Sequence, residues 1–219
     1  MMNRSLSWCA GCIAALVFTL TLAGCQSAYY AAWEKLGVEK RDLLKKRVVA
    51  ARDEQKQAGE EFKDALTRLK EITGFDGGKL EKAYTGLKSD FEDCSAKADA
   101  VRKRIKDMET VATDLFAEWE KEITQINTPA LQASSREQLR ATRERYQGLS
   151  AALRSAEQTM NPVLAQFKDY VLYLKHNLNA QAIASLKNEA TNIQTDISKL
   201  IQQMNQSIAK ADEFVKTLQ

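Results

Sequence analysis

The sequence contains very few of the residues that interrupt helices or build metal centres. Its 219 residues include 2 Pro, 9 Gly and 1 His, and the Pro and Gly counts lie far below average usage. Most positions are instead occupied by Ala, Leu, Glu, Lys, Gln and Arg, a composition typical of long helices. The lone histidine, His176, gives no support to a histidine metal pair or to a histidine base beside a cysteine. We therefore expect no metal, no cofactor and no enzyme activity.

What is present is enough for a folded core. Hydrophobic residues make up 44% of the chain and charged residues 28%, which argues against wholesale disorder. The net charge is +3, and Arg4 is the only charged residue before Cys25. A chain beginning at Cys25 therefore keeps 31 basic and 29 acidic side chains, a net charge of +2. Nothing in this balance requires nucleic acid as a partner.

The N-terminus has the organisation of an export signal. A short basic lead ends at Arg4, and residues 13–22 are apolar and uncharged, as in the hydrophobic region of a signal peptide. A membrane-spanning helix needs about 20 apolar residues, so export followed by cleavage fits better than a permanent span. The pattern predicts a signal peptide over residues 1–24.

The signal ends in Leu22-Ala23-Gly24-Cys25, which resembles the bacterial lipobox. In that motif the Cys thiol receives a diacylglycerol and the chain is cut before it, so the resemblance implies cleavage between Gly24 and Cys25 and lipid attachment at Cys25. Several acyl chains on one residue should anchor the protein stably, since one chain alone binds only marginally. Gln26, where Asp would imply retention in the inner membrane, points by analogy to the periplasmic face of the outer membrane, with the inner membrane as the alternative.

The remaining cysteines simplify after this processing. Cys9 and Cys12 leave with the signal and Cys25 is modified, so Cys94 is the only free thiol and no internal disulfide is possible. Cys94 falls on an apolar seam. A buried small hydrophobe is therefore preferred to a reactive thiol.

Apolar residues in the rest of the chain recur at alternating spacings of four and three, a period of about 3.5. The four seams are Leu44, Val48, Ala51, Gln55, Ala58, Phe62, Ala65, Leu69, Ile72; Leu80, Tyr84, Leu87, Phe91, Cys94, Ala98, Val101, Ile105, Met108, Ala112, Leu115, Trp119; Leu139, Thr142, Tyr146, Leu149, Leu153, Ala156, Met160, Val163, Phe167, Tyr170, Leu174; and Ile183, Leu186, Ala190, Ile193, Ile197, Leu200, Met204, Ser207, Ala211, Phe214, Leu218. In the first seam only Gln55 breaks the apolar rule. We suggest that it fixes the register of the helices at some cost in stability.

The seams predict an all-α fold, an elongated antiparallel coiled-coil four-helix bundle built from two long helical hairpins. The hairpins are expected over about 35–126 and about 135–219. Together they make a helical domain of 35–219, preceded by a lipidated N-terminus and short tether over 25–34.

The breaks between the seams carry helix-ending signals. Residues 73–78 (TGFDGG) predict a stop and a turn, and Asn127-Thr128-Pro129 ends the second helix. Ser134 or Ser135 resembles the cap of the third helix, and residues 176–179 form the weakest break. Pro162 keeps the phase of its seam, which favours a kink within a helix, although a new helix beginning there is the alternative.

Two candidate sites lie in the N-terminal half of the chain. Residues 73–80 (TGFDGGKL) superficially resemble a phosphate-binding loop but fail at both ends and follow a helix, so nucleotide binding is rejected. Tyr29, Tyr30 and Trp33 lie close to the lipid, where amphipathic rings suit a membrane interface. Packing of Trp33 against Trp119 is the competing interpretation.

Charged and exposed residues supply the other candidates. The basic stretch comprises Lys40, Arg41, Lys45, Lys46 and Arg47, diluted by acids, which favours a solvated face over contact with headgroups or cell wall. Arg136, Arg140 and Arg143 share one helical face, with Glu137 and Glu144 near enough to pair with them. Leu172 and Tyr173 lie off the seam and predict an exposed apolar spot or burial by another helix.

The lipobox, the aromatic start after it and the turn-punctuated helical body together resemble an uncharacterised proteobacterial lipoprotein family, a domain of unknown function. The resemblance implies no activity or ligand. We expect a lipid-anchored periplasmic protein with a structural or protein-interaction role, held to the membrane by the acyl chains on Cys25. Its partner would be an envelope protein or the cell wall rather than nucleic acid, and a homo-oligomer stays open. The alternative is a bundle that binds an apolar ligand or lipid between its helices, motivated by Tyr84, Phe91, Tyr146, Phe167, Tyr170 and Phe214.

Overall fold

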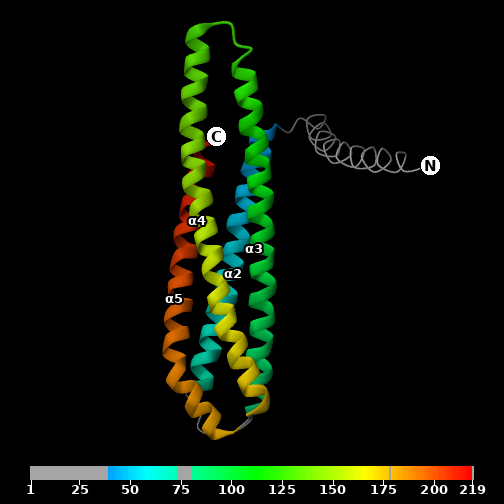
Figure 1. The fold of residues 1–219 in the computed structure, drawn as a ribbon, viewed down its shortest axis with the longest axis vertical. Helices are drawn as coiled ribbons and strands as arrows, with labels where there is room; N and C mark the ends of the chain where they lie inside the picture. Colours follow the sequence, from blue (N-terminus) through cyan, green and yellow to red (C-terminus); the bar gives the residue numbers. More distant parts are fainter. Residues whose placement is uncertain (1–38, 74–79, 178, 219) are drawn as a thin grey trace, which may run out of the picture. The chain divides into compact units, whose positions relative to one another are not determined.

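The computed structural model describes residues 39–73, 80–177 and 179–218. Four helices account for nearly all of them, and these residues contain no strand (Figure 1). The helices are α2 (Lys40–Thr73), α3 (Leu80–Ile123), α4 (Pro129–His176) and α5 (Ala180–Thr217). The prediction of an all-α chain is thereby confirmed for the described residues. None of these helices has a stretch long and apolar enough to cross a bilayer.

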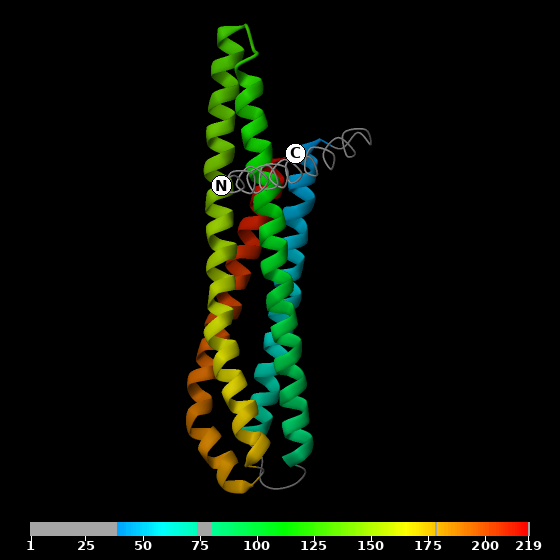
Figure 2. The same cartoon turned by 45° about the vertical axis from the view of Figure 1, so that its right-hand side comes forward.

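The chain divides into two compact units, Met1–Leu43 and Leu44–Gln219. The second unit holds α3, α4, α5 and most of α2. Side-chain contacts connect α2 to both α3 and α5, through Arg68 with Asp90 and Arg52 with Asp212. In turn, α4 lies against α3 on one side and α5 on the other, as Figures 1 and 2 show.

The α3–α4 pair extends beyond the end of α5 (Figure 2). Tyr146 of α4 packs its ring against Phe214, close to the last turn of α5, with ring centroids 5.9 Å apart. Helix α4 begins 17 residues before Tyr146, at Pro129, which corresponds to about 25 Å of helix. The connection between α3 and α4 therefore lies at a tip that α5 does not reach.

The first and fourth seams are buried as predicted. Every residue of the first seam is at most 3% exposed, Gln55 included. Every residue of the fourth seam whose side chain is described is buried as well, and only Ala190 lies outside those side chains. Burial of apolar side chains is the dominant favourable contribution to such a fold, at about 25 cal/mol per Å² removed from water.

Three residues at the start of the second seam, Leu80, Tyr84 and Phe91, are only partly buried. Near their C-terminal ends the second and third seams also depart from the predicted spacing. In α3 the buried residue after Ala112 is Phe116 rather than Leu115, and Trp119 is only partly buried. In α4 Val171 is buried and Tyr170 is partly exposed. Each departure replaces a three-residue step by a four-residue step. An α-helix with 3.6 residues per turn drifts against a strict seven-residue repeat, and an extra step of four absorbs the drift.

The predicted start of the third helix was wrong by six or seven residues. Helix α4 begins at Pro129, with Thr128 as its N-cap, and not at Ser134 or Ser135. Proline is well suited to the first helical position because its missing N–H would have no intrahelical partner there. The Gln132 side chain then donates hydrogen bonds back to the carbonyls of Ile123, at 3.1 Å, and Ile126. These bonds satisfy carbonyls at the end of α3 and close the tip.

Two other predicted breaks agree with the structure. Helix α2 ends at Thr73 and α4 ends at His176, the weakest of the expected breaks. Pro162 lies inside α4, so the alternative of a new helix at this point is wrong.

A polar layer crosses the middle of the core. The amide nitrogen of Gln55 donates to the carbonyl of Leu153 at 3.2 Å, and the Ser207 hydroxyl contacts the Gln55 side-chain oxygen. Gln55 and Ser207 are both 0% exposed. The single polar break in the first seam therefore connects three helices, α2, α4 and α5, at one level.

Candidate functional site

Several predicted site residues lie outside the described part of the chain. These are Gly24 and Cys25 of the processing site, the aromatic residues Tyr29, Tyr30 and Trp33, and residues 74–79 of the segment that resembles a phosphate-binding loop. Trp119, the proposed packing partner of Trp33 in one of the two interpretations, donates its indole N–H to the Ser135 hydroxyl at 2.9 Å.

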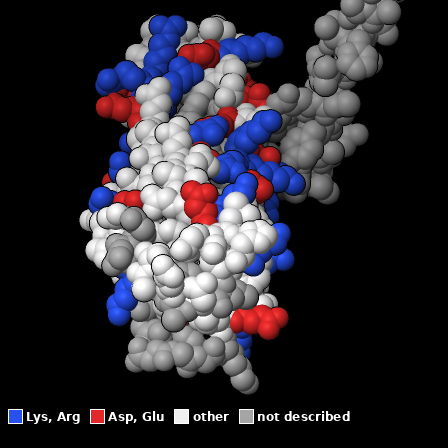
Figure 3. Space-filling view, turned by 60° about the horizontal axis from the view of Figure 1, so that its bottom comes forward, with Lys and Arg blue, Asp and Glu red and all other residues white. Residues whose placement is uncertain are grey.

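Three other candidates, Cys94, Leu172 and Tyr173, lie within the described helices. Cys94 is fully buried, and burial is the main cause that raises the pKa of its thiol, so the interpretation as a small core residue is confirmed. Leu172 and Tyr173 are 48% and 39% exposed, which makes the exposed-spot interpretation the correct one. Figure 3 views the end where α4 passes into α5, and its described surface carries few charged side chains.

The outer groove between α3 and α4 is crossed by a series of ion pairs, which we call the groove pairs. Arg102 Nε lies 2.7 Å from a Glu157 carboxylate oxygen, and Arg143 Nη1 lies 2.8 Å from Glu120. Between them Arg154 Nε donates to Glu109 at 2.8 Å. The groove pairs are Arg102–Glu157, Glu109–Arg154 and Glu120–Arg143. Each one joins an acid on one helix to an arginine on the other.

Near the tip the groove widens into a hollow of about 420 Å³. This tip hollow is lined by Glu120, Ile123, Thr124, Arg136, Leu139, Arg140, Arg143, Glu144 and Gln147. Ile123 and Leu139 give it an apolar floor, since both are almost fully buried. Its volume falls in the lower part of the range for ligand-binding pockets, about 300–1,000 Å³. It can hold one or two side chains of a partner.

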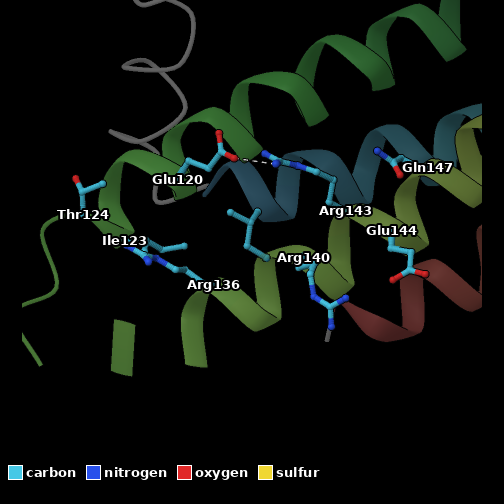
Figure 4. A pocket seen from close by; sticks show the side chains of 9 residues that line it. Glu120, Ile123, Thr124, Arg136, Arg140, Arg143, Glu144 and Gln147 are labelled. Carbon is cyan, nitrogen blue, oxygen red and sulfur yellow. Dashed lines mark hydrogen bonds and ion pairs between the residues drawn. The ribbon is translucent and has the colours of Figure 1, made fainter. Parts of the chain in front are cut away.

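The arginines of the tip hollow differ in what they contact. Arg143 reaches Glu120 across the groove, its guanidinium carbon 5.3 Å from the centroid of the Phe116 ring, while Arg136 extends toward Ile123 and Thr124 (Figure 4). Arg140 points away from α3 and pairs with Glu137 at 2.6 Å. The pairing of Arg140 with Glu137 was expected, whereas the partner of Arg143 lies on α3 rather than at Glu144.

These pairs set the electrostatics of the tip. The hydrogen bond from Arg143 lowers the pKa of the Glu120 carboxyl, and the one from Arg140 lowers the pKa of Glu137. Both acids therefore stay ionised and balance their arginines. The charge of Arg136 is different, because its guanidinium makes no ion pair or hydrogen bond with any residue that the structure describes.

The register of the groove pairs leaves Arg136 without an acid opposite it. The residue numbers in the three pairs sum to between 259 and 263. The same register places residues 123–127 (ITQIN) opposite Arg136, and this stretch contains no acid. Thr124 occupies the tip hollow instead, with its hydroxyl donating to the Lys121 carbonyl at 2.6 Å. The series of ion pairs thus ends with one charge uncompensated.

The arginines of the tip hollow can bind anionic groups. Arginine binds carboxylates and other oxyanions through a planar, bidentate donor set. The described residues hold no group of three or more side chains able to bind a metal ion. The sequence indicated the arginine face but not the hollow, because the hollow depends on which α3 residues face α4.

Comparison with known proteins supplies a family. No curated protein and no solved structure matches the chain. The profile of a family described as protein of unknown function (DUF2959) matches residues 29–218. This match covers all four helices and both sides of the tip hollow. The chain belongs to that family of unknown function.

Proposed function

We propose that this chain is a lipid-anchored envelope protein of the periplasm, with a structural or protein-interaction role. The anchor is a diacylglycerol on Cys25, after removal of residues 1–24, and the location is the periplasmic face of the outer membrane. The support for this part is the Leu22-Ala23-Gly24-Cys25 motif behind an apolar stretch of the right length.

We further propose that the helical body is an antiparallel coiled-coil four-helix bundle of two hairpins. Seams that keep a spacing of four and three over most of their length support it. So do the polar contacts of Gln55 with α4 and α5 in the core. The body then acts as a stiff rod that holds its α3–α4 tip at a fixed distance from the other end of the bundle.

The observation that carries the interaction role is the tip hollow with its unpaired Arg136. The other arginines of the groove, Arg102, Arg143 and Arg154, each pair with an acid of the facing helix. A guanidinium beside an apolar surface is typical of a protein-binding site, since arginine is enriched at the centres of interfaces.

The anchor is tested by mass analysis of the protein purified from cell membranes. We expect a thioether-linked diacylglycerol at Cys25, and its loss in the variant Cys25→Ala. Cys12→Ala is the matched control, because Cys12 follows the same small residues but leaves with the signal. An unmodified N-terminus in the cell-derived protein contradicts the anchor.

The interaction role is tested by photo-cross-linking in intact cells. A photoreactive residue replaces Gln147, which is exposed and lines the tip hollow. The control position is Lys168, also exposed on α4 but remote from the tip. Protein or cell-wall adducts at residue 147 and none at 168 support the proposal, while equal or absent adducts contradict it.

The alternative of an apolar ligand between the helices was motivated by six aromatic residues, and four of these pack against other rings. Phe91 packs edge-to-face on Phe167, and Tyr146 packs edge-to-face on both Phe116 and Phe214. Such pairs fill the space that a ligand would need.

A further inference from the structure

We infer that the tip hollow binds a carboxylate side chain of an acidic peptide segment, which pairs with Arg136 and completes the series of groove pairs. This inference rests on the proposed interaction role and names the chemistry of the partner. Its occupant is a segment of another protein that presents Glu or Asp beside an apolar residue.

The charges along the groove favour a carboxylate at Arg136. The three groove pairs each neutralise an arginine with a carboxylate from the facing helix. Only at Arg136 does the facing stretch of α3 lack an acid, and its place is held by Thr124. A partner carboxylate therefore supplies what the chain supplies for itself at every earlier pair.

The shape and lining of the tip hollow also fit a segment of this kind. The tip hollow has room for the carboxylate and one apolar neighbour, which would cover the edges of Ile123 and Leu139. Covering these edges excludes water from the new ion pair and strengthens it, since a pair at a bare surface contributes little. Glu144 and the paired Glu120 disfavour a polyanion and favour a single carboxylate.

The described helices leave the tip hollow open to an incoming segment. Helix α5 meets α4 along a different face, through the contacts of Tyr146 with Phe214 and of Gln166 with Asp196. The hollow lies in the groove toward α3, and α5 ends well before the tip. An extended segment can therefore lie along the groove without displacing any described helix.

The binding test uses the full chain, purified from cell membranes in a non-ionic detergent. The probe is a fluorescent peptide built from glutamate and leucine, and its control is the same peptide with glutamine in place of glutamate. We expect the glutamate peptide to bind at least about tenfold more tightly than the glutamine peptide, as a charge-assisted hydrogen bond implies.

Two variants locate the binding at the tip hollow. Arg136→Gln should weaken glutamate-peptide binding about tenfold, whereas Lys168→Gln removes one charge elsewhere on α4 and should leave it unchanged. Thr124→Glu places an acid opposite Arg136 inside the chain and should block the peptide. Thr124→Gln, of similar size and uncharged, should not.

Three results would overturn the inference. They are equal binding of the two peptides, equal losses in Arg136→Gln and Lys168→Gln, and Arg136-dependent binding of short-chain phosphatidylglycerol without Arg136-dependent binding of the peptide. The last result would assign the hollow to a lipid headgroup. If position-specific adducts at residue 147 persist in cells while the peptide fails, the proposed function stands and only the carboxylate assignment is lost.

Discussion

The hydrogen bonds of the polar layer predict different changes in the free energy of unfolding for substitutions at Gln55 and at Ser207. The Ser207 hydroxyl contacts both the Gln55 oxygen and the carbonyl of Met204, the latter at 2.8 Å. Gln55 has no other donor for its side-chain oxygen among the described contacts. Removing one partner therefore has a different consequence from removing the other.

Ser207→Ala should destabilise the protein. It leaves the Gln55 oxygen buried without a donor, which costs about 1–3 kcal/mol. At about 2–4 °C per kcal/mol for a chain of this size, the Tm falls by about 2–12 °C. Gln55→Leu should change the free energy of unfolding by less than about 1.5 kcal/mol, because leucine fills a similar volume and Ser207 keeps its bond to Met204. In the double variant the penalty of Ser207→Ala should disappear.

Far-ultraviolet circular dichroism monitors the thermal and urea unfolding of the wild-type protein, the two single variants and the double variant. Ser198→Ala is the control, since Ser198 lies exposed on α5 and bonds only within its own helix, and it should change stability by less than about 0.5 kcal/mol. The reasoning is refuted if Gln55→Leu is more damaging than Ser207→Ala, or if the two changes add without coupling.

Two further predictions concern the core. Phe167→Ala should lower the free energy of unfolding by about 3–5 kcal/mol, because it removes a fully buried ring that packs on a second aromatic ring. The control Leu172→Ala changes an exposed residue and should lower the free energy of unfolding by less than about 0.5 kcal/mol. Similar urea midpoints for the two variants would contradict the burial of Phe167. Cys94 should resist iodoacetamide in the native protein and react once urea unfolds it. Burial raises the pKa of its thiol above the ordinary value of 9.0, so the unfolded chain ionises first as pH rises. The stabilising contribution of the neutral thiol is therefore complete below about pH 9 and declines above it, and a flat stability profile in alkaline urea titrations would contradict the assignment.

The local parts of this fold could be predicted from the sequence. Burial of Leu44 through Ile72 follows from a spacing that repeats along one helix, and a helix presents a repeating face whatever it packs against. Failures came where an extra residue shifts the face, at Phe116 and Val171, because the strict repeat hides the choice between steps of three and four. The start of α4 failed for another reason. The sequence predicts a helix end at Pro129, but proline also fits the first position of the next helix.

The site could be predicted only in part, because its meaning depends on pairs far apart in the sequence. Arg136, Arg140 and Arg143 share one face of a single helix, and acids of the same helix, Glu137 and Glu144, are near enough to pair with them. Packing against α3 changes the result, since Glu120 takes Arg143 and no acid stands opposite Arg136. An uncompensated charge is thus a property of the register between two helices. A shift of α3 by one turn would bring Glu120 or Glu122 toward Arg136 and remove the site, so the same core contacts that fix the register also maintain the open arginine.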